Sequence, residues 1–333
     1  MSNATRYVVG IDLGTTNTTL SFVDTAGVEE GEEHIPVQEF PVPQVTAAGA
    51  VEPRATLPSM LYQAAGPELP ADSLHLPWRR EEKSVLGVFA RELGGKNPSR
   101  FIHSSKSWLC HGGVDRKERI LPWRSEDEEA RRSPMEVATA IVAHLREAWD
   151  HAVARGDRSM ALAAQEITLC VPASFDAEAR NLTVEAAQKA GLKDFHLLEE
   201  PQAAFYSWIE NAGRHWRKKV HVGDSVLVVD VGGGTTDFSL IAVTEEEGEL
   251  ALRRVAVGEH ILLGGDNMDL ALAFSMKAEL EAAGKKVDGM QLLALVQQCR
   301  AGKERLLSHP DEEEFAITLL GRGSSLVGGT IRG

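Results

Sequence analysis

Two glycine-rich turns of the same layout, far apart in the chain, constrain its fold more than any other feature. Residues 8–23 read VVGIDLGTTNTTLSFV, and residues 228–240 read VVDVGGGTTDFSL. In each copy an apolar strand ends in an aspartate, Asp12 or Asp230, and a Gly/Thr turn leads into a second strand. A repeat of short period would predict a solenoid, whereas two copies so widely separated predict two similar lobes.

The three consecutive glycines of the second turn require a physical reason. Glycine inside a β-pattern costs roughly 0.5–1 kcal/mol relative to alanine at each position. A hairpin turn that needs positive φ angles would explain one or two of them. Backbone N–H groups that closely approach a phosphate would explain all three. The turn alone leaves both interpretations open.

Composition narrows the classes of function. The chain has 333 residues, and 35 basic against 49 acidic residues give a net charge of −14. Its length predicts two domains. The acidic balance argues against binding of nucleic acid or of an anionic membrane, which needs a basic face. Three isolated cysteines and the lack of a long apolar run favour a cytoplasmic protein.

The middle of the chain alternates between strand and helix patterns. SPME at residues 133–136 is a capping box that begins a long amphipathic helix. A strand at 166–172 precedes a helix at 176–191, and this alternation predicts an α/β sheet. The highly charged residues 111–132 are expected to form an exposed insertion.

Four carboxylates stand near the glycine turns or at strand ends: Asp12, Glu200, Asp230 and Asp237. Aspartates so placed can hold magnesium through its water shell. In phosphoryl transfer to water, one carboxylate orients the nucleophile while a metal and a cation offset charge on the phosphate. We found none of the P-loop, dinucleotide-binding or metalloprotease motifs in the sequence.

Several segments together resemble the actin-like ATPase fold and, within it, the DnaK-type heat-shock chaperone family. The resemblance holds in order and spacing from residue 8 to about residue 330. It rests on these segments: GIDLGTTNT (10–18), VPASFDAEAR (171–180), LEEPQAAFYSW (198–208), VVDVGGGTTDFSL (228–240), LGGDNMD (263–269) and CRAGKERLLS (299–308). NPSRFIHSSKSWL (97–109) matches more loosely.

The resemblance implies an α/β fold of two RNase-H-like lobes around a nucleotide cleft. Lobe I is expected at residues 1–212, with an outer subdomain at about 29–130. Lobe II is expected at 213–333, with its outer subdomain from about 260. The family's second adenosine motif, linker and peptide-binding domain find no match, so we expect a truncated nucleotide-binding domain with an incomplete second lobe.

The resemblance also implies a site for ATP or ADP with Mg²⁺. The residues expected to cradle the phosphates are Gly14, Thr15, Thr16, Gly232, Gly233, Gly234 and Thr235. Asp12 and Asp230 are expected to hold the hydrated magnesium, and Glu200 to organise the attacking water. Asp237 is expected to coordinate potassium or orient water. Lys303 and Ser308 are expected to contact the adenosine. Pro172 and Arg180 are expected to relay the nucleotide state to a partner domain.

One departure concerns the catalytic cation. The family's lysine is expected in a VGxxAK motif, where LGVFAR puts Arg91 in this chain. Arginine keeps the charge but is not equivalent to a compact ammonium group, so hydrolysis could be slow or lost. Solvated surface side chains are the alternative interpretation of Arg91, Arg180 and Lys303.

The function implied by the resemblance is an ATP-binding and ATP-hydrolysing module of a DnaK-related chaperone. Hydrolysis would change the angle between the lobes and so drive a partner domain that holds a peptide or protein client. A J-type co-chaperone and a nucleotide exchange factor are the further partners implied. Three alternatives stay open: a nucleotide sensor that does not hydrolyse, a filament-forming actin-like scaffold, and a sugar kinase.

Overall fold

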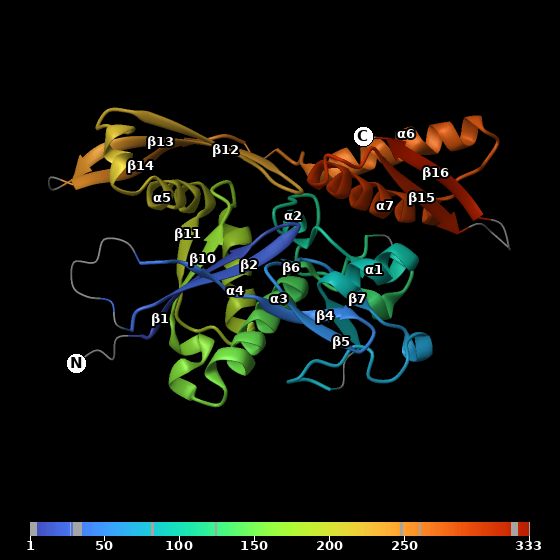
Figure 1. Cartoon of the computed structure of the whole chain (residues 1–333), viewed down its shortest axis with the longest axis horizontal. Helices are drawn as coiled ribbons and strands as arrows, with labels where there is room; N and C mark the ends of the chain where they lie inside the picture. The colour runs from blue at the N-terminus through green and yellow to red at the C-terminus, as the bar shows by residue number, and fades with distance from the viewer. Residues whose placement is uncertain are drawn as a thin grey trace.

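The computed structural model describes residues 5–26, 28, 35–80, 83–123, 125–246, 249–259, 261–320 and 326–332. Helices and sheets alternate through this part of the chain, which confirms the α/β class predicted from the sequence (Figure 1).

The largest sheet has the order β11-β10-β1-β2-β3, and β6 also pairs with β2. Its strands are β1 (Tyr7–Leu13), β2 (Asn17–Asp24), β3 (Gln38–Glu39), β6 (Leu57–Pro58), β10 (Glu166–Val171) and β11 (His196–Glu199). β1 runs antiparallel to β2 and parallel to β10. Alternate residues of β1, from Tyr7 to Leu13, are buried, while Asp12 is exposed on the other face. The period of two therefore turns Asp12 away from the core.

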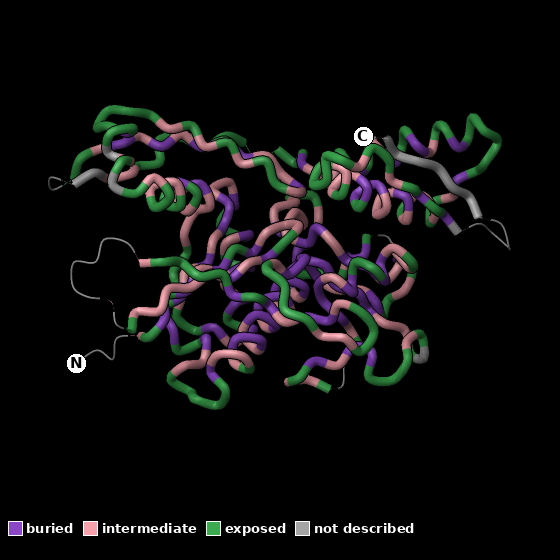
Figure 2. The backbone as a smooth tube through the Cα atoms, in the orientation of Figure 1, coloured by how far each residue is buried: buried purple, intermediate pink, exposed green. Residues whose placement is uncertain are grey.

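Helices α3 (Pro134–Trp149) and α4 (Ala177–Lys189) contribute to the same core as this sheet. The predicted capping box is confirmed, because the Ser133 hydroxyl accepts from the Glu136 amide and the Ser133 amide donates to the Glu136 carboxylate. Trp149 is fully buried and meets the rings of Tyr7 and Phe22 edge to face. Buried residues concentrate in this part of the molecule (Figure 2).

An outer group of elements lies beside this sheet in Figure 1. It comprises β4 (Val42–Ala47), β5 (Ala50–Arg54), β7 (Leu61–Gln63), β8 (Ser84–Leu86), α1 (Val88–Lys96), β9 (Phe101–Ile102) and α2 (Ser105–Leu109). The prediction that residues 111–132 are an exposed insertion is wrong in part. Leu121 and Ala130 are buried, and the buried guanidinium of Arg116 holds Asp176 with two hydrogen bonds.

The rest of the chain forms two further groups. Helix α5 (Glu200–Ala212) leads to the antiparallel sheet β12 (Ser225–Val231), β13 (Thr236–Glu246) and β14 (Glu249–Val257). Helices α6 (Gly265–Ala282) and α7 (Gly289–Ser308) share a separate core with β15 (Glu314–Leu320), which pairs with β16 (Leu326–Arg332). Like β1 and β2, β12 and β13 form an antiparallel pair joined by a glycine-rich turn, so the predicted twin layout is confirmed.

Candidate functional site

The structure answers why the second turn carries consecutive glycines. Gly232, Gly233 and Gly234 are absent from the residues with positive φ, so turn conformation does not require them. A Cβ on Gly233 would lie 1.9 Å from the Thr16 hydroxyl oxygen, and one on Gly234 would lie 2.1 Å from the Ser107 hydroxyl oxygen. Bare backbone is needed at Gly233 and Gly234 because the first turn and α2 come directly against the second turn.

A cavity of about 740 Å³ lies between the two turns and extends along β1, β12 and the first turns of α5. Its lining includes these residues predicted for phosphate, metal or water: Asp12, Gly14, Thr15, Thr16, Glu200, Asp230, Gly232, Gly233 and Thr235. The structure thus brings together most of the predicted site. Gly234 is not among the lining residues and instead packs against Ser107 and Thr15.

One lysine stands among the carboxylates of this cavity. The Lys106 ammonium nitrogen lies 2.5 Å from a Glu200 carboxylate oxygen, and both side chains are largely buried. Burial alone would lower the pKa of Lys106, but the charges of Glu200, Asp12 and Asp230 outweigh it and raise that pKa. Lys106 therefore stays protonated at neutral pH.

The carboxylates themselves are crowded. Burial raises the pKa of Glu200, and the charges of Asp12 and Asp230 add to this against the opposing effect of Lys106. Burial likewise raises the pKa of Asp230, and the neighbouring charge of Asp237 contributes. Asp237 is directly opposite Asp230 in the β12–β13 register and is 8% exposed. Glu200, Asp12 and Asp230 face the single ammonium group of Lys106, and the net negative charge that remains would be neutralised by a bound cation.

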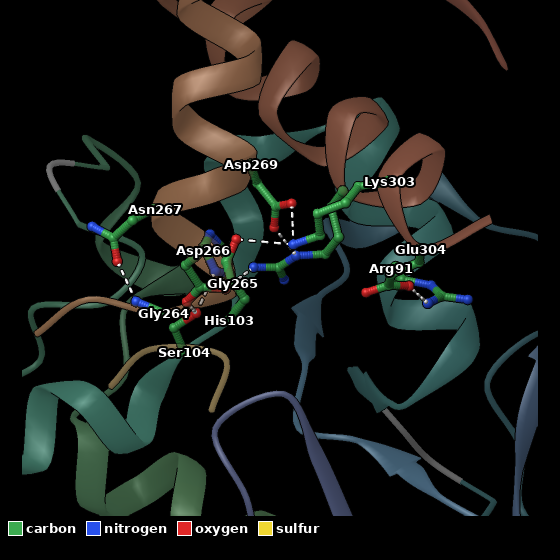
Figure 3. Close-up of polar contacts among 11 residues, drawn as sticks. Arg91, His103, Ser104, Gly264, Gly265, Asp266, Asn267, Asp269, Lys303 and Glu304 are labelled. Atoms are coloured by element: carbon green, nitrogen blue, oxygen red, sulfur yellow. Dashed lines mark hydrogen bonds and ion pairs between the residues drawn. The ribbon is translucent and has the colours of Figure 1, made fainter. Parts of the chain in front are cut away.

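Arg91 does not occupy the position predicted for the catalytic cation. It lies on α1, away from the cavity lining, and its guanidinium makes an ion pair with Glu304 of α7 (Figure 3). Their side chains are 42% and 40% exposed. The cation that lines the cavity is Lys106, in residues 97–109, whose resemblance to the family is looser. Lys106 is the one lysine of that segment, and this was the available signal in the sequence.

The remaining predicted residues lie outside the cavity lining. Lys303 contacts the Asp269 carboxylate at 2.6 Å and donates to the Gly265 carbonyl. Ser308 is the exposed last residue of α7. Arg180 donates to Glu199, which also pairs with Arg254 of β14.

Pro172 is buried directly after β10, and its carbonyl accepts from the Phe175 amide. It thus lies in the turn before α4, the helix that carries Arg180. The structure brings Arg180, Glu199 and Arg254 together in one charged group, with Pro172 at the end of the neighbouring strand.

No group of three His, Cys, Asp or Glu side chains in the described residues is arranged to hold a metal ion directly. Within the same ranges, we found no helix with the length and apolar character needed to cross a membrane.

Comparisons with known proteins agree with the family resemblance of the sequence. A family model described as "Hsp70 protein" matches residues 89–322. The chain is 30% identical over 316 residues to the chaperone protein HscA homolog of Pseudomonas aeruginosa, which covers 90% of this chain and 42% of that protein. It is 28% identical over 274 residues to the chaperone protein HscA of Proteus mirabilis, covering 80% of this chain and 37% of that protein. The chain therefore spans less than half the length of these relatives.

Proposed function

The chain belongs to the Hsp70 family, and we propose that it is an ATP-binding and ATP-hydrolysing module of a chaperone of that family. One observation carries the proposal. Asp12, Glu200, Asp230 and Lys106 converge in a cavity between two glycine-rich turns that bring bare backbone close together. This is the arrangement that phosphoryl transfer needs, since catalysis there consists mainly of positioning and neutralisation of charge.

The phosphates of the nucleotide would lie against the two turns, with backbone amides and threonine hydroxyls as donors. The residues proposed for this are Gly14, Thr15, Thr16, Gly232, Gly233, Gly234 and Thr235. Lys303 and Ser308, proposed for the adenosine, lie on α7 outside the cavity lining, so this part of the proposal has the weakest geometric support.

The carboxylates present fit magnesium. Asp12 and Asp230 would hold it through its water shell, because the described residues form no direct three-ligand group and magnesium keeps several waters. Bound there, magnesium would neutralise charge on the terminal phosphates. The excess of carboxylate over ammonium charge supports this assignment. Asp237 as a potassium-coordinating or water-orienting group stays a proposal, supported by its place opposite Asp230.

We assign two roles in hydrolysis to the chain's own residues. Glu200, with its raised pKa, would orient the attacking water and accept its proton. Lys106 would take the role expected of Arg91 and hold positive charge beside the terminal phosphate. The sensor alternative rested on an arginine in the lysine position, and the place of Lys106 beside Glu200 supports hydrolysis over it.

Coupling to a partner domain belongs to the same proposal. Lobe I would comprise residues 1–212 and lobe II residues 213–333, with outer subdomains at about 29–130 and from about 260. The Arg180–Glu199–Arg254 group bridges α4 and β14, and Pro172 lies nearby in sequence, which supports these residues as the relay. A peptide or protein client, a J-type co-chaperone and an exchange factor would be the partners, in the cytoplasm.

The first test is calorimetric titration of magnesium-ATP into the 333-residue chain and two variants. Asp230→Asn should abolish binding, whereas Arg91→Ala, the control, should retain it because Arg91 lies outside the cavity. Single-turnover hydrolysis should then fall about 100-fold or more in Glu200→Gln. If the unaltered chain shows no binding, or if Asp230→Asn binds as well as it does, the proposal fails.

A further inference from the structure

A second polar cluster lies outside the cavity, where the segment before α2 meets α6 and α7 (Figure 3). We call it the Asp266 cluster. Its members are His103, Ser104, Asp266, Asp269, Arg300 and Lys303. None of them lines the cavity.

The ionic part of this cluster is balanced and buried. Arg300 pairs with Asp266 and, at 2.8 Å, with Asp269, while Lys303 approaches Asp269 at 2.6 Å. The side chains of Arg300 and Asp269 are only 3% and 1% exposed. Two cations against two anions make the group neutral, as a buried ionic group must be to avoid a large desolvation cost.

Two residues of the segment before α2, His103 and Ser104, complete the cluster. The Ser104 hydroxyl donates to the Asp266 carboxylate, and the His103 Nδ1 lies 2.8 Å from the Ser104 hydroxyl oxygen. Because that hydroxyl is already a donor, the imidazole donates to it through Nδ1–H. Burial and the charge of Arg300 lower the pKa of His103 to about 4, so the ring is neutral at pH 7.

Ser104 carries backbone strain that this contact helps to hold. Its φ is 54°, in the left-handed region that costs a residue with a Cβ roughly 1 kcal/mol. Such a conformation persists only where surrounding contacts impose it. Its hydroxyl reaches across to Asp266, so the hydrogen bond and the strained conformation occur at the same residue.

Asp266 is also attached to the second glycine turn. Its backbone amide donates to the Gly233 carbonyl at 2.7 Å, and the Gly265 amide donates to the Gly232 carbonyl at 3.1 Å. Ser104 is two residues before Lys106, and Ser107 packs against Gly234. One residue thus holds the glycine turn by its main chain and the segment carrying Lys106 by its side chain.

We propose that Asp266, through Ser104, is the positioning residue that sets Lys106 against the second glycine turn. The inference rests on the proposed nucleotide site. It adds which contact sets the geometry of that site. Arg300, which is itself paired with Asp269, keeps Asp266 in place from α7.

The test compares Ser104→Ala with Ser105→Ala, the same change one residue along. Ser104→Ala leaves all ion pairs of the cluster intact, so the fold should survive. Asp266 is not substituted, because its loss would leave Arg300 buried with an incomplete set of partners. Ser104→Asn is the rescue variant, since asparagine tolerates the left-handed region and its amide can donate to Asp266.

The first measurement needs no nucleotide. Hydrogen exchange followed by mass spectrometry should show faster exchange in residues 100–110 and 228–240 for Ser104→Ala, unchanged exchange for Ser105→Ala, and restored protection for Ser104→Asn. Exchange in Ser104→Ala equal to that of the unaltered chain would overturn the proposal. This measurement remains decisive even if the chain does not bind ATP, in which case only the proposed function fails.

The second measurement uses a fluorescent ATP analogue with magnesium. Ser104→Ala should dissociate it about 10-fold faster, the effect of losing one hydrogen bond to a charged group. The same change in a Lys106→Ala background should add little, because Ser104 acts through Lys106. Full additivity of the two changes, or an equal effect from Ser105→Ala, would contradict the positioning role.

Discussion

Replacing Lys106 with alanine tests the centre of the candidate site without any ligand. The substitution removes the ammonium group that faces Glu200, Asp12 and Asp230 and leaves the three carboxylates without their cation. Lys106 and Glu200 are 13% and 17% exposed, with 2.5 Å between nitrogen and oxygen. Removing one partner of a buried pair costs about 3–5 kcal/mol. We expect a loss of about 3 kcal/mol in unfolding free energy at pH 8.

The loss should depend on pH in a defined direction. The pKa values of Glu200 and Asp230 are already raised, and removing the cation raises them further. As the pH falls these groups take up protons, so the destabilisation should shrink between pH 8 and pH 5. Magnesium should also restore part of the lost stability at pH 8, because it replaces the missing positive charge.

The assay is urea denaturation followed by tryptophan fluorescence, with Arg91→Ala as the matched control. The Arg91–Glu304 pair is exposed and joins atoms 3.2 Å apart, so its loss should change stability by no more than about 0.5 kcal/mol. Equal destabilisation by the two variants would refute the placement of Lys106 among the carboxylates. A loss in Lys106→Ala that did not change with pH would refute the electrostatic account.

Two further predictions follow from burial and close packing. Burial lowers the pKa of His144 from 6.5 to about 4, so the unfolded chain binds a proton at this residue before the folded chain does. The stability advantage of the unaltered chain over His144→Gln should therefore be full above pH 6.5 and decline by roughly 3 kcal/mol toward pH 4. Denaturation at several pH values measures this difference in stability, and a difference that did not change with pH would contradict the prediction. Gly264→Ala would place a methyl carbon 2.6 Å from the Gly232 carbonyl oxygen and should destabilise the fold by about 1–3 kcal/mol. In the control Gly289→Ala the added carbon meets nothing within 4 Å, so that change should be neutral or stabilising. Thermal denaturation of both variants measures the difference.

Local patterns in the sequence were sufficient for much of the fold. The capping box at Ser133 and Glu136 begins α3 as predicted, because its two hydrogen bonds join residues three apart. The alternation along β1 turns Asp12 away from the core for a reason contained in the strand itself. The twinned turns predicted two related hairpins, and both are present.

Packing between distant segments decided the rest. Arg91 and Lys106 each lie on a helix, and the packing of those two helices decides which side chain faces Glu200. Residues 111–132 were predicted to be exposed, but Arg116 in this segment is buried because it donates hydrogen bonds to Asp176, which lies far from it in the sequence.

The two glycine-rich turns show most clearly which features follow from the sequence and which follow from tertiary packing. The sequence by itself indicated the family and the α/β class, and it placed Asp12 and Asp230 each at a strand end before a glycine-rich turn, because motif order and strand periodicity are properties of the chain. Only the tertiary structure decided that Lys106 is the cation of the site and that Ser107 and Thr16 are the reason for bare backbone at Gly234 and Gly233. Those contacts join residues far apart in the chain, and a distance between two surfaces is set by how whole elements pack rather than by any local pattern.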